Sequence, residues 1–366
     1  MKFEIQRDAL FKALQGVIGV VEKRQTMPIL SNVLLKTAGT ELQITGTDLE
    51  LELVNTILVE KATDGEIAVP ARKLFDICRG LPEGANLSFE VKDQRATLKS
   101  GRSRFVLATM NAEEFPVLDA IEEGQSFSVS RSALAGLLDK THFAMAHQDV
   151  RYYLNGLLLE VNANRVRCVA TDGHRLAMSD VQADLAADLD IQVIVPRKAI
   201  TEMQRLLGES DDQIELTVNA HHLQIQLGTI RFTSKLIDGR FPDYERVIPA
   251  EGTEIMVADR ETVRLALSRT AILSNEKFRG VRLCLSDGHL RLQAHNPEHE
   301  EAEEDLEVDY SGSGLEIGFN VNYLMDALGC MQADRFVLEL TSSDSSGLLR
   351  EEGDDDSKYV VMPMRL

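Results

Sequence analysis

The sequence predicts an α+β protein made of three copies of one unit, each with two helices against antiparallel sheets. The stretch EIAVPARKLFDICRGLPEGANLSFEV at 66–91 has counterparts that begin at 191 and 315. Each copy reads as a short strand, a helix opened by Pro or Asn, and a strand of alternating polarity. A second stretch, NVLLKTAGTELQITGTDLELE from residue 32, aligns without a gap with the stretches from 156 and 280, at a spacing of 124 residues.

Each unit opens with a helix, continues through alternating strands joined by a polar turn, and then carries its second helix. We expect roughly eight strands per unit. The opening helices are expected at 7–24, 131–151 and 259–279, and the second helices at 70–84, 196–208 and 320–335. The polar segments DAIEEGQS and IPAEGTE have the composition of linkers, so the units are expected to span 1–122, 123–249 and 250–366.

The composition is that of a soluble globular protein, with 44% hydrophobic residues and no run of 18 apolar residues that could cross a bilayer. The first residues, MKFEIQRDALFKALQ, read as a strand and an amphipathic helix, not as a signal or transit peptide. A cytoplasmic protein without a membrane partner is therefore expected. Four cysteines lie far apart among apolar neighbours and are predicted to be buried thiols, neither disulfides nor zinc ligands: Cys78, Cys168, Cys284 and Cys330.

The stretch ATDGHRLAM at 170–178 places an acid, a base and a glycine together, as many catalytic loops do, and DGH recurs at 287–289. The repeat alignment does not superpose the two strings, because Asp172 corresponds to Asp48 and to Asn296. The string at 287–289 lies in a polar turn between alternating strands, which is the pattern of a hairpin, and the string at 172–174 lies at a repeat corner where the other two copies carry no histidine. We therefore predict no catalytic residue, and no enzyme activity, for this chain.

Two further motifs concern metals and nucleotides. HNPEH at 295–299 fits the H-x-x-E-H pattern of zinc metalloproteases. Pro297, however, fits a helix only at its start, which leaves His295 outside the helical turn that the metal needs. The sequence has no GxxxxGK[ST] phosphate loop, so the chain cannot by itself use ATP. No metal and no cofactor are expected.

The net charge of −20 is unevenly distributed along the chain. The six expected helical segments hold 19 Lys and Arg against 12 Asp and Glu, whereas the rest of the chain holds 20 against 47. One interpretation is that solvated helix faces are simply rich in Lys and Arg. The other is that the helices face a polyanion while the acidic exterior prevents indiscriminate binding.

Several blocks resemble the bacterial DNA polymerase III beta subunit family, the sliding clamps, in order along the whole chain: ARKLFDICRGLPEGA, MAHQDVRYYLNG, VATDGHRLA, FTSKLIDGRFPDYERV, AILSNEKFRGVRL and YVVMPMRL. The resemblance implies three domains of the DNA clamp fold, and a head-to-tail homodimer whose six domains form a ring around double-stranded DNA. Such a ring holds DNA by topology and without reading its sequence.

The same resemblance implies a function and partners. The expected function is that of a processivity factor of the DNA polymerase III holoenzyme in DNA replication, which tethers the replicative polymerase subunit. Loading would need a separate clamp-loader ATPase complex. Other DNA polymerases, ligase and mismatch-repair proteins would bind through a short peptide motif with glutamine, leucine and phenylalanine positions.

Site residues also follow from the resemblance. The client-peptide pocket is expected at Leu154, Thr171, Gly173, His174, Arg175, Leu176, Pro242, Arg246, Val247, Val360, Val361, Met362, Pro363, Met364 and Leu366. DNA contacts are expected from Arg24, Arg72, Arg79, Gln148, Tyr152, Tyr153, Arg197, Lys198, Lys235, Lys277 and Arg279. The dimer interface is expected to pair Lys73, Arg102, Arg104, Phe105 and Leu107 with Ile272, Leu273, Glu298, Glu300, Glu301, Glu303 and Glu304.

Some features leave alternatives open. The last helical segment has only one basic residue, Arg335, which predicts little DNA contact there. The acidic stretch EEGDDDSK at 351–358 has no assigned role. Tyr152 and Tyr153 could be core aromatics instead of DNA contacts. An alternative to the clamp is a non-enzymatic peptide-binding scaffold of the same fold that does not act on DNA.

Overall fold

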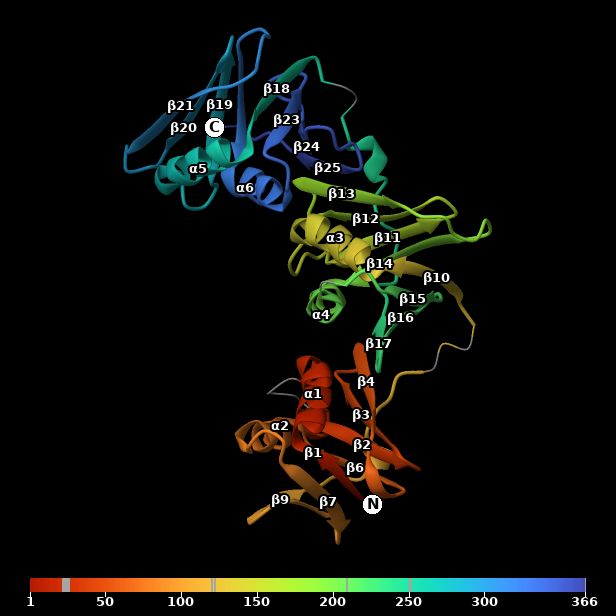
Figure 1. Ribbon diagram of the computed structural model, residues 1–366. Coiled ribbons are helices and arrows are strands. Elements are labelled where there is room, and N and C mark those ends of the chain that lie inside the picture. The colour runs from red at the N-terminus through yellow and green to blue at the C-terminus, as the bar shows by residue number, and fades with distance from the viewer. Residues whose placement is uncertain (22–26, 120, 122, 209, 250–251, 366) are drawn as a thin grey trace. The chain divides into compact units, whose positions relative to one another are not determined.

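The computed structural model describes residues 1–21, 27–119, 121, 123–208, 210–249 and 252–365 (Figure 1). These residues form two compact units. The first unit consists of Met1–Ser132 with Thr201–Leu236, and the second consists of Ala133–Ile200 with Ile237–Leu366.

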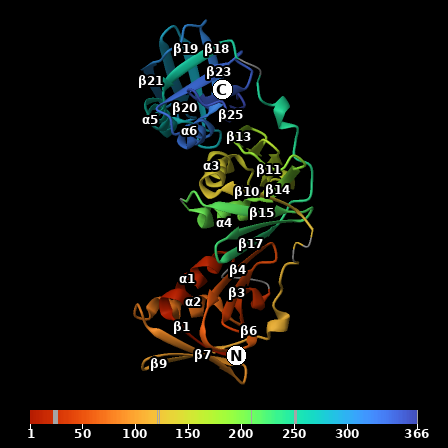
Figure 2. The same cartoon turned by 45° about the vertical axis from the view of Figure 1, so that its right-hand side comes forward.

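The first unit contains two antiparallel sheets. Its strands are β1 (Lys2–Gln6), β2 (Asn32–Ala38), β3 (Glu41–Thr47), β4 (Leu51–Leu58), β5 (Glu60–Thr63), β6 (Gly65–Pro70), β7 (Asn86–Lys92), β8 (Arg95–Ser100), β9 (Ser103–Ala108), β10 (Gln125–Ser130), β15 (Gln213–Val218), β16 (His222–Leu227) and β17 (Ile230–Lys235). One sheet has the order β5-β1-β7-β8-β9 and the other the order β10-β15-β16-β17-β4-β3-β2-β6. Helices α1 (Arg7–Val17) and α2 (Ala71–Gly80) lie side by side, and α1 packs on β3 and β4 (Figures 1 and 2).

The second unit repeats this plan. Its strands are β11 (Gly156–Asn162), β12 (Arg165–Thr171), β13 (Arg175–Gln182), β14 (Asp190–Pro196), β18 (Glu254–Asp259), β19 (Gly280–Ser286), β20 (His289–His295), β21 (Glu301–Glu307), β22 (Leu315–Asn320), β23 (Arg335–Leu340), β24 (Gly347–Glu351) and β25 (Ser357–Val361). They form sheets of order β14-β11-β12-β13-β25-β24-β23-β18 and β21-β20-β19-β22. Helices α5 (Arg260–Thr270) and α6 (Val321–Cys330) lie side by side (Figures 1 and 2).

Neighbouring repeats share their sheets. Strand β4 of the first repeat pairs with β17 of the second, and β13 of the second pairs with β25 of the third. The register is the same at both junctions, because the third residues of the paired strands lie opposite each other: Leu53 opposite Phe232, and Ala177 opposite Tyr359. This sharing explains why three repeats of sequence fold into two compact units.

The repeat corners that the sequence alignment placed in correspondence are strand-connecting turns in all three repeats. The side chain of Asp48 accepts a hydrogen bond from the Leu51 N–H at 2.7 Å, and Asp172 accepts one from the Arg175 N–H at 3.0 Å. Asn296 occupies the same corner in the third repeat and accepts from the N–H of a residue four positions on, at 2.9 Å. The corner of the third repeat is therefore one residue longer than the other two.

The helices are shorter than expected from the sequence. The remaining two are α3 (Arg131–Thr141) and α4 (Arg197–Leu207). Each opening helix gives way to a 3-10 turn: η1 (Ile18–Val20), η4 (His142–Ala144) and η7 (Ala271–Leu273). Further 3-10 turns are η2 (Pro28–Ser31), η3 (Ala112–Glu114), η5 (Tyr152–Leu154) and η6 (Tyr244–Arg246).

One arginine in each repeat has a structural role that the charge pattern concealed. Arg7, Arg131 and Arg260 are the first residues of the opening helices. Their guanidinium groups donate to carbonyls at or just beyond the end of the second helix, for example Arg7 Nη2 to the Arg79 carbonyl at 2.9 Å. These carbonyls lack helical partners, and the negative end of the helix dipole favours a cation there. Each of the three pairs of helices is thus held together by one of these arginines.

The cysteine prediction is only partly right. All four cysteines are free thiols, and Cys78 and Cys168 are buried as expected. Cys284 and Cys330 are only half-buried. Cys284 lies on β19, whose alternate side chains face away from the core, and its apolar sequence neighbours gave a misleading signal.

Candidate functional site

An apolar cluster on the second repeat brings together side chains that are distant in sequence. It joins β11, β12, β13 and β14 to the segment 241–248 and to β24 and β25. Val247 packs against the cluster and keeps part of its surface exposed. We call this cluster the repeat-2 seat, with buried members Leu158, Val169, Leu176, Met178, Ile194, Phe241, Tyr244, Leu348 and Val360.

The stretch 170–178 forms the edge of this seat. Asp172 orders the turn between β12 and β13, and His174 is exposed. Arg175 bonds to the Asp172 carboxylate at 3.1 Å and donates to the Phe143 carbonyl at 2.7 Å. Its guanidinium also lies over the ring of Tyr323 on α6, 4.5 Å from the centroid. Arg175 therefore links the second repeat to the third. Most of the hydrogen-bonding capacity of its guanidinium is already used within the chain.

The C-terminal segment leads from this seat to the third repeat. The Met362 N–H donates to the His174 carbonyl at 2.9 Å, and the Met364 N–H donates to the Gly318 carbonyl of β22 at 2.8 Å. Met362 is 36% exposed, so an apolar, flexible side chain borders the seat. Methionine adapts to different binding partners, which suits a shared peptide site.

The predicted client-pocket residues fall on the segments that border this cluster. Leu176 and Val360 belong to the seat and Val247 lies against it. Leu154, Thr171 and Val361 are buried, Gly173, Arg175, Pro363 and Met364 are half-buried, and His174, Pro242, Arg246 and Met362 are exposed. Leu366 lies outside the described residues.

The residues predicted to contact DNA divide into exposed and engaged groups. Exposed positions are Arg72, Arg79, Gln148, Tyr152, Lys235 and Lys277, and Lys198 and Arg279 are half-buried. Gln148 and Arg279 have positive φ angles of 54° and 50°. Arg24 lies outside the described residues.

Several of these candidates already have partners within the chain. Arg72 donates to the Val21 carbonyl at 3.2 Å, and Arg79 is paired with Asp76 at 2.7 Å. Arg197 donates to the Met145 carbonyl at 2.6 Å, and burial lowers the pKa of its guanidinium. Tyr153 packs against the repeat-2 seat, whereas the neighbouring Tyr152 is 58% exposed. The two tyrosines, which the sequence could not tell apart, therefore have different environments.

The residues predicted for the dimer interface lie on β9 and β21, on the turns that precede these strands, on helix α2 and on the 3-10 turn η7. Strand β9 ends the five-stranded sheet, and β21 ends the four-stranded sheet. Lys73, Arg102 and Arg104 are exposed, Phe105 is half-buried, and Leu107 is buried in its own unit. Ile272 is 75% exposed, Leu273 is half-buried, and Glu298, Glu300, Glu301 and Glu303 are exposed.

Some of the acidic residues already have partners within the chain. Glu304 bonds to Arg269 at 2.6 Å, which lowers the pKa of the carboxyl. Glu303 lies 3.0 Å from Arg291. Both pairs would have to persist or exchange if a second copy approached this edge.

Other motifs have simple structural explanations. HNPEH at 295–299 spans the end of β20 and the turn to β21, so neither histidine lies on a helix. The stretch 351–358 forms the turn between β24 and β25, where Asp354 pairs with Lys140 of α3 at 3.3 Å. Within the described part of the chain, no cluster of three or more His, Cys, Asp or Glu could hold a metal ion. None of the described helices has the length and apolar character that crossing a membrane requires.

Three repeats of two helices and antiparallel strands, joined edge to edge through shared sheets, define a protein of the DNA clamp class. Sequence comparison is specific: residues 1–119, 128–243 and 245–365 match the N-terminal, central and C-terminal domains of the DNA polymerase III beta subunit. The chain belongs to the DNA polymerase III beta subunit family.

Full-length relatives agree with this assignment. The chain is 54% identical to the beta sliding clamp of Pseudomonas aeruginosa and 46% identical to that of Escherichia coli K12, with 100% of both chains covered in each case. Among solved structures, the DNA polymerase III subunit beta from Pseudomonas aeruginosa superposes with a TM-score of 0.98 at 54% identity over the whole of both chains. The Caulobacter crescentus beta subunit gives a TM-score of 0.95 at 40% identity, again over both full chains.

Proposed function

We propose that two copies of this chain close head to tail into a ring around duplex DNA, and that the ring tethers the replicative polymerase and other clients. The observation that carries the proposal is the repeated junction. Two junctions between repeats are built inside the chain with the same register. The equivalent edges for a third junction, β9 and β21, stand at the ends of their sheets. A second copy supplies the missing partner for each edge.

The internal junctions give the register of the third. In the first repeat Glu52 of β4 lies opposite Thr47, and in the third repeat Glu301 of β21 lies opposite His295, at the equivalent position. Transferring the β4–β17 register places Phe105 of one copy opposite Ala302 of its partner. Arg104 then lies opposite Glu303, an opposite-charge pair across the strands.

Side chains at the second junction support the same arrangement. Phe143 of η4 packs on Tyr359 of β25 with ring centroids 6.0 Å apart. Their repeat counterparts are Ile272 and Phe105, so the exposed Ile272 would be covered by the partner's Phe105. The apolar contact would supply most of the affinity, and exposed ion pairs would mainly fix the register.

The helix pair of the first repeat would face the same junction. Tyr323 of α6 lies under Arg175 at the second junction. The counterparts of these two residues at the third junction are Lys73 and Glu300. The cation–π contact inside the chain would thus be replaced by an ion pair between copies.

Contact with DNA would be made by exposed cations and polar side chains without base reading. The six helices hold 13 basic against 6 acidic residues, and three of the basic ones cap second helices. The exposed Lys235, Lys277 and Tyr152 are the strongest candidates, whereas Arg72 and Arg79 are exposed but already bond to the Val21 carbonyl and to Asp76. Arg197 is a weaker candidate because main-chain carbonyls already hold it. Such contacts are few and sensitive to salt, so a ring could slide.

Clients would insert apolar anchors of a short peptide at the repeat-2 seat, between Val247 and Met362. One such seat per copy makes clients compete. We further propose that the chain is a processivity subunit without catalysis of its own, acts in the cytoplasm, and depends on a clamp-loader ATPase. The division into domains 1–122, 123–249 and 250–366 belongs to the same proposal.

The decisive experiment is retention on DNA. The protein is loaded with a clamp loader and ATP onto a nicked circular plasmid, the complex is isolated, and the plasmid is then linearised. Release on cutting is the expected result, because a ring can leave only a DNA that has ends. Retention after cutting would indicate tight direct binding, and failure to load with a competent loader would favour the scaffold alternative.

A further inference from the structure

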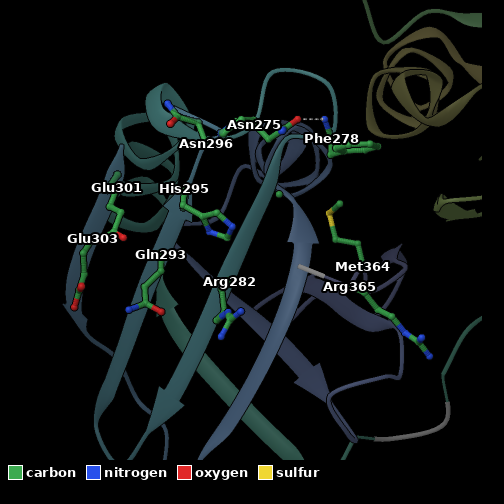
Figure 3. Close-up of a pocket in the computed structure, with 14 residues that line it drawn as sticks. Asn275, Phe278, Arg282, Gln293, His295, Asn296, Glu301, Glu303, Met364 and Arg365 are labelled. Carbon is green, nitrogen blue, oxygen red and sulfur yellow. Dashed lines mark hydrogen bonds between the residues drawn. The ribbon is translucent and has the colours of Figure 1, made fainter. Parts of the chain in front are cut away.

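A large pocket lies on the third repeat. It has a volume of about 860 Å³ and is lined by residues that include Phe278, Arg282, Gln293, His295, Met364 and Arg365 (Figure 3). Phe278 is 55% exposed beside Met364, and Arg282 and Gln293 stand on the strands that form the floor.

This pocket occupies the position that the repeat-2 seat occupies one repeat earlier. Arg282 is the third residue of β19, as Leu158 is the third residue of β11. Gln293 is the fifth residue of β20, as Val169 is the fifth of β12. The first repeat has its own version, in which Leu34, the third residue of β2, belongs to an apolar cluster.

In the first two repeats a phenylalanine from the following segment of chain covers this position. Phe115 belongs to the cluster of the first repeat, and Phe241 belongs to the repeat-2 seat. The covering segments start from the same hydrogen bond: Met110 N–H to the Ala68 carbonyl and Ile237 N–H to the Ile194 carbonyl, both at 2.9 Å.

The third repeat makes the same starting bond, from Met364 N–H to the Gly318 carbonyl at 2.8 Å. No described residue after Met364 places an aromatic ring over the strands, and the pocket lies where that ring would pack. The exposed Phe278 at its edge is an apolar surface for such a group.

The chemistry of the floor indicates what could fill the pocket. Arg282 is paired with Glu316 at 3.3 Å, and the acidic residue Glu303 is paired with Arg291 at 3.0 Å. Arg365 is exposed and has no ion pair within the described chain. The lining also contains the exposed Glu301, so the complementary ligand has an aromatic group and a carboxylate placed towards Arg365 and away from Glu301.

We propose that this pocket is a second peptide seat, which binds an extended acidic and aromatic segment of the client whose apolar anchors occupy the repeat-2 seat. The inference rests on the proposed client-binding function. Continuity supports it, because the main-chain bonds of Met362 and Met364 carry one short segment from the first seat to the second. A client that uses both seats gains affinity through effective concentration, without a stronger contact at either.

The test uses two fluorescent peptides and the full-length protein. The anchor peptide has the glutamine, leucine and phenylalanine positions described above. The seat peptide is NAEEFPVLD, the sequence of residues 111–119, which carries two glutamates before a phenylalanine and covers the equivalent position of the first repeat. We expect the seat peptide to bind saturably, and its Phe→Ala version to bind about tenfold more weakly.

The protein variants locate the binding. Phe278→Ala and Arg365→Glu should each weaken the seat peptide about tenfold and leave the anchor peptide unchanged. Met362→Ala should weaken only the anchor peptide, and Lys36→Glu, an exposed charge reversal on β2 of the first unit, should change neither. Unchanged melting temperature and dimer mass verify that the variants fold.

Two results would overturn the second seat. One is a lack of saturation by the seat peptide at millimolar concentration. The other is weakening of the seat peptide by Met362→Ala but not by Phe278→Ala, which would place it at the repeat-2 seat. Failure of the anchor peptide alone would instead count against the proposed client function.

Discussion

Truncation of Ile272 should open the proposed ring without unfolding the chain. The side chain is 75% exposed in a single copy, so its removal leaves the fold of the unit intact. On closure we expect it to be covered by the partner's Phe105, as the ring of Phe143 packs against Tyr359 inside the chain. Ile272→Ala removes three carbon groups, worth about 2 kcal/mol at each junction after allowance for the part that is already covered. A head-to-tail pair has two junctions, so dimer formation should weaken by about 4 kcal/mol, or roughly a thousandfold.

The assay measures the mass distribution of the protein over a dilution series, by sedimentation or by single-particle mass measurement. Leu265→Ala is the matched control, because Leu265 is also an exposed aliphatic residue of the third repeat, at 44%, but lies on α5. We expect the control to dimerise like the parent chain. A shift of less than about tenfold for Ile272→Ala, or an equal shift in the control, would refute the placement of the interface.

Three further predictions concern the register, a buried carboxyl and the client seat. Arg104→Cys combined with Glu303→Cys should form disulfides between copies on a non-reducing gel, whereas Arg104→Cys with Glu301→Cys should not, because directly opposite residues on paired strands come close enough to bridge. Burial raises the pKa of Glu52, whose carboxyl becomes harder to ionise in the folded state. The folded state therefore binds the proton more tightly, so stability decreases as the pH rises through the window above the ordinary value of 4.5. Glu52→Gln should raise the melting temperature at pH 7, and that gain should shrink as the pH is lowered towards this value; a gain independent of pH would contradict the assignment. Val247→Asp should weaken anchor-peptide binding about tenfold in fluorescence polarisation while the dimer stays intact, since it puts a charge against an apolar cluster.

Most of the fold could be predicted from the period of the sequence repeat. Because equivalent strands and corners recur at nearly constant spacing, the sequence identified the turn at Asp172 as a hairpin corner and not as a catalytic loop, and the structure confirms that corner. Alternation predicted the strands well, since each sheet has one face against a core. The end of each opening helix was harder to predict from the sequence, because the 3-10 turns that follow continue the apolar pattern without α-helical hydrogen bonds.

The roles of single charges and aromatics depend on tertiary contacts and could not be predicted locally. Arg7 looks like any helix cation in the sequence, yet its guanidinium binds carbonyls more than 70 positions away, at 71 and 72 residues' separation. Adjacent Tyr152 and Tyr153 differ only in which of them reaches the apolar cluster. Glu304 looks available in the acidic stretch but is already bonded to Arg269.

The two edge strands, β9 and β21, also determine which incorrect assemblies copies of the chain could form. In the proposed assembly β9 pairs with β21 and not with itself, so every added copy would leave one edge of each kind available at the ends of the assembly. The same contact would build a closed ring if the rotation between successive copies closes, and an open filament if it does not. Substitutions far from either edge that change this rotation should convert dimers into polymers while every contact between copies stays the same.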